Sequence, residues 1–262
     1  MKLNIVPARS GIQWVKLGAQ AFMKQPLGLT GLTFMFGAIY ALLVNLGAVG
    51  AVALGLLTPA GSLAMFVATE RVTQGQFPLP SVFAAAFRNG RTCTRAILML
   101  GAIHIAILLG LFALVTLLSA GPLVEVTQAA DGNPPQVKMK PAFLLLGALQ
   151  LPLLVLFAYA PALVYWHGLS ATKSLFFSLV AFWRNLRAFI TYSAAWVLIL
   201  SMVLIGLSLL AGGQAALLVQ FFAPFSLVLL AMMFTSLYFS FRDSFIATPP
   251  DPQPPPATPG PL

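Results

Sequence analysis

Residues 27–69 read LGLTGLTFMFGAIYALLVNLGAVGAVALGLLTPAGSLAMFVAT and contain no Asp, Glu, Lys or Arg. An α-helix needs about 20 apolar residues to cross the hydrocarbon core of a bilayer. This stretch is therefore too long for one transmembrane span and long enough for two, with a turn expected near residues 47–50. We place the two spans at residues 27–46 and 50–69, and they mark the chain as an integral membrane protein.

The rest of the chain has a matching composition. Of its 262 residues, 60% are hydrophobic and 7% are charged, whereas soluble domains carry about 25% charged residues. Four further apolar stretches are predicted to span the bilayer, at residues 96–120, 142–166, 190–211 and 214–241. The predicted fold is an all-α membrane domain of six transmembrane helices over residues 27–246. It lies between an amphipathic segment, residues 1–26, and a proline-rich tail, residues 247–262, that we expect to be disordered.

The basic residues predict the orientation in the membrane. Twelve of the 14 Lys and Arg residues lie before the first span, in the loops 70–95 and 167–189, or after the sixth span. Only Lys138 and Lys140 lie on the other side, in the loop 121–141. Because Lys and Arg gather on the cytoplasmic side of membrane proteins, we expect both termini and both basic loops in the cytoplasm. The net charge of +9 is thus explained without nucleic acid.

A plan recurs three times along the chain. An amphipathic stretch is followed by an aromatic and basic segment, which we call a junction, then by a span without proline and a span with proline. The junctions are Phe22-Met23-Lys24, Phe87-Arg88-Asn89-Gly90-Arg91 and Trp183-Arg184-Asn185-Leu186-Arg187. We expect three hairpins of spans, each preceded by a helix in the headgroup region, over residues 1–26, 79–91 and 170–187. The simpler alternative is ordinary loops whose charges set the topology.

Two groups of residues are candidates for function. The first group combines side chains of the junctions that suit contact with anionic lipid or a membrane partner: Lys24, Arg88, Asn89, Arg91, Trp183, Arg184, Asn185 and Arg187. The second group consists of polar side chains within the spans, which either bond neighbouring helices or line a cavity: His104, Gln150 and Gln220. A passive or facilitated transporter and a structural subunit of a membrane complex are the alternatives to lipid engagement.

Catalysis is not expected. The five Asp and Glu residues lie outside the predicted spans, the chain has one cysteine, Cys93, and it contains no P-loop, G-x-S-x-G or G-x-G-x-x-G motif. We therefore predict no cofactor, no metal and no catalytic residue. No predicted span holds Asp, Glu, Lys or Arg, which argues against ion-coupled transport because such transport uses charged groups inside the bilayer.

Several short motifs resemble those of an uncharacterised family of bacterial inner-membrane proteins. They are Gly11 and Trp14 ahead of Pro26, Pro59-Ala60-Gly61-Ser62, Gly75-x-x-Pro78 and Phe87-Arg88-Asn89-Gly90-Arg91. The plan is also similar to the membrane portion that accompanies some glycerophosphodiester phosphodiesterases. The resemblance implies a six-helix fold in the bacterial cytoplasmic membrane. It implies no activity, because the catalytic domain of those phosphodiesterases has no counterpart in this chain.

Overall fold

The computed structural model describes residues 2–119, 124–127, 136–139 and 141–246. The proline-rich tail predicted at residues 247–262 lies outside the described residues. Six helical segments of the described chain are long and apolar enough to cross a membrane, which confirms an all-α multi-pass membrane protein. They are α2 (Pro26–Val44), α3 (Gly47–Thr73), α5 (Gly90–Leu118), α6 with α7 (Pro141–Ala158 and Ala160–His167), α9 (Leu186–Leu210) and α10 (Ala215–Ser244).

The spans differ in two respects from those predicted. The turn between α2 and α3 is formed by Asn45 and Leu46, just before the expected residues 47–50, and Gly47 supplies a positive φ of 60° there. Several spans also run beyond their apolar core, so Arg91 and Arg95 belong to α5 itself. Apolar length predicts where a helix crosses a bilayer, but it does not fix the residue at which the helix begins or ends.

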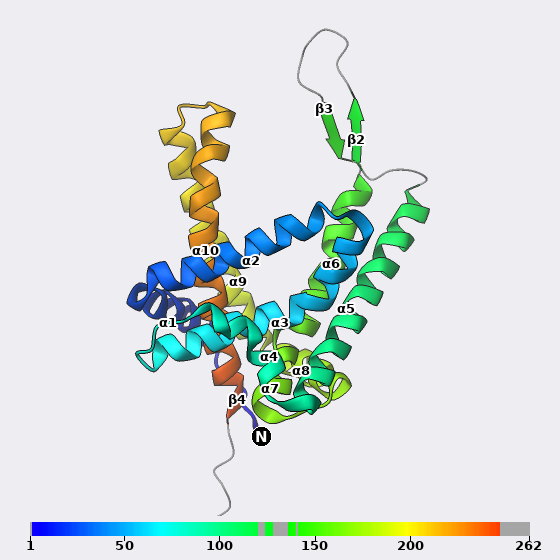
Figure 1. Ribbon diagram of the computed structural model, residues 1–262. Helices are drawn as coiled ribbons and strands as arrows, with labels where there is room; N and C mark the ends of the chain where they lie inside the picture. Colours follow the sequence, from blue (N-terminus) through cyan, green and yellow to red (C-terminus); the bar gives the residue numbers. More distant parts are fainter. Residues whose placement is uncertain (1, 120–123, 128–135, 140, 247–262) are drawn as a thin grey trace, which may run out of the picture.

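Shorter elements lie around the spans. The helices are α1 (Ser10–Lys24), the 3₁₀-helix η1 (Pro80–Ala84), α4 (Ala85–Arg88) and α8 (Ala171–Arg184). Strand β1 (Lys2–Leu3) pairs with β4 (Phe245–Ile246), and β2 (Val124–Thr127) pairs with β3 (Gln136–Met139), both antiparallel. Figure 1 shows α4, α7 and α8 at the end of the molecule away from β2 and β3. We call it the basic end, because the second and third junctions lie where α4 and α8 end.

Each short helix, or the 3₁₀-helix η1 before it, packs against a pair of spans other than the pair it leads into; α4 contacts α5 as well. The helices η1 and α4 contact α3 of the first hairpin, and α8 contacts α6 and α7 of the second. Helix α1 contacts α9 and α10 of the third hairpin. The three contacts form a cycle, so α1 joins the last hairpin to the beginning of the chain (Figure 1).

Helix α1 packs so closely that two glycines are required. A Cβ on Gly18 would lie 2.6 Å from the Cα of Ser236 on α10, and one on Gly11 would overlap the backbone of α9. The indole of Trp14 is 1% exposed. The sequence predicts a helix in the headgroup region here, but α9 and α10 cover its aromatic side. Its polar side, with Lys16 and Gln20, stays exposed.

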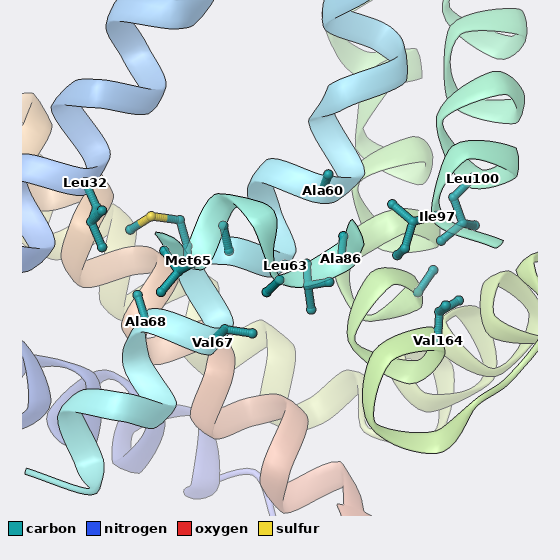
Figure 2. Close-up of a cluster of buried hydrophobic side chains, with 14 of the residues drawn as sticks. Leu32, Ala60, Leu63, Met65, Val67, Ala68, Ala86, Ile97, Leu100 and Val164 are labelled. Atoms are coloured by element: carbon teal, nitrogen blue, oxygen red, sulfur yellow. The ribbon is translucent and has the colours of Figure 1, made fainter. Parts of the chain in front are cut away.

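Helix α3 is the centre of the packing. In the most apolar 18-residue stretch of α3, 56% of the residues are buried inside the protein. The corresponding buried share is 6% in α9 and 6% in α10. Figure 2 shows Leu63, Met65 and Val67 of α3 pointing into a core that α5 and α7 join through Leu100 and Val164. The outer faces of α9 and α10 are apolar and exposed, as expected of helices whose solvent is lipid.

The fourth span is broken at Tyr159. The hydroxyl of Ser178, on α8, accepts a hydrogen bond from the Tyr159 amide at 3.2 Å and donates to the Val155 carbonyl at 2.9 Å. This hydroxyl replaces the direct bond that an unbroken helix would make between these two groups. Pro161 follows in the first turn of α7, where a missing N–H costs little.

Candidate functional site

The three junctions occupy the same position in the fold. Helix α1 ends at Lys24, α4 at Arg88 and α8 at Arg184. In each case the next residue has an amide side chain, and the residue after it begins a span. These amide residues are Gln25, Asn89 and Asn185. A basic side chain therefore stands directly before the N-terminus of α2, α5 and α9, where the helix dipole also carries positive partial charge.

An exposed apolar side chain precedes each of these basic residues. Met23 is 71% exposed, Phe87 41% and Trp183 72%. Lys24, Arg88, Arg184 and Arg187 are also exposed. None of the described carboxylates forms an ion pair with these bases. Each junction thus presents an apolar and a cationic group side by side, without an internal counter-ion in the described chain.

The two asparagines of the junctions serve packing. Asn89 Nδ2 donates to the Tyr165 carbonyl on α7 at 3.2 Å. Asn185 is 1% exposed; its Oδ1 accepts a hydrogen bond from the Val6 amide at 2.9 Å, and its Nδ2 donates to the Asn4 carbonyl at 3.0 Å. Asn185 therefore does not lie on the lipid-contacting face where the sequence placed it. It fastens the N-terminal segment to the start of α9.

The second junction forms a hollow. It has a volume of about 450 Å³ and is lined by Phe87, Arg88, Gly90, Arg91, Thr94, Arg95 and Leu98. Arg91 and Arg95 are four residues apart on α5 and so lie on one face, and Gly90, with a φ of 88°, allows the chain to turn from α4 into α5. The lining holds three guanidinium groups and no carboxylate. Phe87 and Leu98, which is 43% exposed, add apolar walls.

The candidate residues chosen from the sequence omitted Arg95 and Leu98. The spacing of four between Arg91 and Arg95 could have placed Arg95 beside the junction. The apolar pattern begins the predicted third span at residue 96, however, and so assigns Arg95 to the preceding loop. The earlier start of α5, at Gly90, brings these residues onto one helical face.

The polar residues within the spans are not brought together. His104 Nδ1 lies 3.2 Å from the Gly55 carbonyl oxygen of α3, and its ring centroid lies 4.9 Å from that of Phe157 on α6. Gln150 is partly buried on α6, and Gln220 is exposed on α10. In Figure 1 the first turns of α10, which carry Gln220, stand apart from α5 and α6. The described residues therefore do not join His104 and Gln220 in one polar path.

The fold and the arrangement of charge define the class: a multi-pass helical membrane protein with a basic end. The chain is 33% identical over 255 residues, 94% of each chain, to a probable inner membrane protein of Burkholderia thailandensis. It belongs to the same family of bacterial inner-membrane proteins, as its motifs led us to expect. No family model matches the chain, and no solved structure matches it.

Proposed function

We propose that this protein binds anionic phospholipid at its basic end, which we place at the cytoplasmic leaflet of the inner membrane. The observation that carries the proposal is the hollow lined by Arg88, Arg91 and Arg95. A guanidinium group binds phosphate oxygens in pairs. The unpaired N–H groups at the start of a long helix such as α5 add further donors and positive potential.

The apolar groups of the hollow favour a lipid over a soluble anion. Phe87 and Leu98 are exposed beside the arginines. A phospholipid whose phosphate is bound by the arginines would therefore place its acyl chains against these two side chains. A soluble anion would gain nothing from them. The excess of Lys and Arg at this end also favours the cytoplasmic side, where anionic lipids give the membrane surface its negative potential.

The first and third junctions offer weaker versions of the same site. Lys24 stands beside exposed Met23, and Arg184 stands beside exposed Trp183. Because each has fewer basic groups near its helix start than the second junction, we rank the second junction as the tightest. We infer a binding role for this surface rather than a catalytic one. A transporter would need a polar path across the bilayer, and the positions of His104 and Gln220 do not favour one.

The similarity in plan to the membrane portion of some glycerophosphodiester phosphodiesterases stays a prediction. It fits a protein that works at the lipid surface, and it adds no residue to the site. A membrane-protein partner at the same basic surface is the competing proposal. It would be distinguished by a partner that copurifies in mild detergent and is lost when Arg88, Arg91 and Arg95 are all replaced by Gln.

The proposal is tested on the full chain purified in mild detergent. The triple variant Arg88→Gln, Arg91→Gln, Arg95→Gln is compared with wild type for phosphatidylglycerol retained per protein, measured by mass spectrometry of extracted lipid. Each base near an anionic surface contributes about 1 kcal/mol, so affinity for the tightest site should fall on the order of 100-fold at low salt. Matched Arg→Lys changes keep the charge and should retain most of the lipid. Unchanged retention in the glutamine variant overturns the proposal.

A further inference from the structure

A second hollow lies between α1 and the end of α10. It has a volume of about 250 Å³ and is lined by Gln13, Trp14, Leu17, Phe239, Arg242 and Asp243. Its position is separate from the arginine hollow, since α1 packs on α9 and α10 whereas η1 and α4 pack on α3 and α5. The size suits a headgroup rather than a drug-sized molecule, whose pockets are usually about 300–1,000 Å³.

This hollow differs from the first in holding both signs of charge. Asp243 is half-buried and Arg242 is exposed. Although they are neighbours in the chain, they form no ion pair with each other in the described structure. The guanidinium of Arg242 instead lies over the Tyr238 ring, 5.9 Å from its centroid. Arg242 also interacts with the side chain of Tyr238 and electrostatically with Glu70, and it remains exposed to a ligand beside Asp243.

The carboxylate of Asp243 is held in place at one oxygen. Its Oδ2 accepts a hydrogen bond from Trp14 Nε1 at 2.9 Å, and Trp14 is itself buried against Phe189 and Tyr192. Its Oδ1 has no partner among the described residues. A carboxylate has room for about four hydrogen bonds, so the free oxygen is a fixed acceptor for a donor that enters the hollow.

We propose that this hollow binds a phosphoethanolamine group, with the primary ammonium at Asp243 and the phosphate at Arg242. The ammonium carries three N–H donors that suit a carboxylate oxygen, and the exposed guanidinium suits a phosphate. The side-chain amide of Gln13 adds a donor and an acceptor at the rim. Leu17, which is 41% exposed, and Phe239 supply apolar walls that would receive acyl chains, so phosphatidylethanolamine and soluble phosphoethanolamine share this chemistry.

The chemistry predicts a preference between two zwitterionic headgroups. Choline carries the same charge as ethanolamine but has three methyl groups in place of the N–H donors. It cannot donate to Asp243, and the carboxylate would lose hydration without a hydrogen bond in return. The site should therefore prefer ethanolamine to choline, a distinction that charge alone does not make.

The experiment measures binding of phosphatidylethanolamine and phosphatidylcholine to the full chain by native mass spectrometry. Wild type should bind phosphatidylethanolamine at least five-fold more tightly than phosphatidylcholine. Asp243→Asn keeps an acceptor for Trp14 but loses the charge, and it should reduce the preference to two-fold or less. Arg242→Gln should weaken both lipids. Competition by soluble phosphoethanolamine assigns the site to the free headgroup, and its absence assigns the site to the lipid.

Two outcomes overturn the proposal. One is equal binding of the two lipids by wild type, and the other is a full preference in Asp243→Asn with unchanged thermal stability. The triple variant Arg88→Gln, Arg91→Gln, Arg95→Gln serves as control, because it removes the anionic-lipid hollow and should leave the ethanolamine preference intact. A wrong ethanolamine proposal would therefore be revealed by the Asp243→Asn variant, and a wrong anionic-lipid proposal by the triple arginine variant.

Discussion

The side-chain Oδ1 of Asn185 accepts a hydrogen bond from the backbone amide of Val6, 179 residues away in the chain, at 2.9 Å. The same amide side chain donates to the Asn4 carbonyl, and Asn4 N donates to the Ser244 carbonyl at 2.9 Å. The start of the chain, the start of α9 and the end of α10 therefore meet at one buried residue. This meeting point closes the cycle in which α1 packs on the third hairpin.

Asn185→Ala should destabilise the protein. The change leaves the Val6 amide and the Asn4 carbonyl without their partner in a buried place, and each such group costs about 1–3 kcal/mol. The measurement is the midpoint of thermal unfolding in detergent. Asn89→Ala is the matched control, because Asn89 is exposed and its Nδ2 donates to one carbonyl, that of Tyr165, and its effect should be clearly smaller. Equal effects of the two variants would contradict the role given to Asn185.

Gly18→Ala should loosen α1 from α10. A Cβ at this position would lie 2.6 Å from Ser236 Cα, and backbone cannot move aside as a flexible side chain can, so we expect a loss of about 1–3 kcal/mol. Gly31→Ala on α2 is the control, since a Cβ there meets nothing within 4 Å and alanine favours a helix. The readout is unfolding in detergent, and a loss in Gly31→Ala as large as that in Gly18→Ala would argue against the close contact.

Ser178→Ala should disturb the break in the fourth span. The Tyr159 amide and the Val155 carbonyl would both lose the hydroxyl that joins them, at a cost of about 1–3 kcal/mol. Ser174→Ala is a strict control on the same helix, since Ser174 is equally buried but its hydroxyl donates only to Ala171 within α8. If the two alanine variants unfold at the same temperature, Ser178 does not support the break.

The orientation is tested by labelling cysteines in intact cells with a maleimide that does not cross membranes. Cys93 is buried, so the wild-type chain should stay unlabelled and can serve as the background. A cysteine at Asn133, in the loop 121–141, should react from outside the inner membrane. One at Gln20, on the exposed side of α1, should react only after the cells are opened. The reverse pattern would refute the cytoplasmic placement of the basic end.

Much of the fold was predictable from the sequence, because a chain surrounded by lipid must satisfy its backbone hydrogen bonds internally. An uncharged stretch such as residues 27–69 must satisfy its backbone within helices, and the length of a span follows from bilayer thickness. The six spans were predicted on this ground. Their ends were not, since the helices continue past the apolar core into residues such as Arg91 and Arg95, whose long side chains can reach the headgroups.

The candidate site was predictable only in part. Lys24, Arg88 and Arg184 were found because they recur at equivalent positions, and repetition is visible in a sequence. The burial of Asn185 and of Trp14 was not, because their partners lie 179 and 229 residues away and no local pattern records such a contact. An amphipathic stretch also looks the same whether lipid or protein covers its apolar side, and for α1 the cover is α9 and α10.

The central claim is that Arg88, Arg91 and Arg95 hold an anionic lipid. It is tested most directly by an electron cryo-microscopy structure of the full chain in nanodiscs that contain phosphatidylglycerol. The account predicts headgroup density within hydrogen-bonding distance of these guanidinium groups, with acyl-chain density along Leu98. An empty hollow, with ordered lipid elsewhere on the molecule, would contradict it.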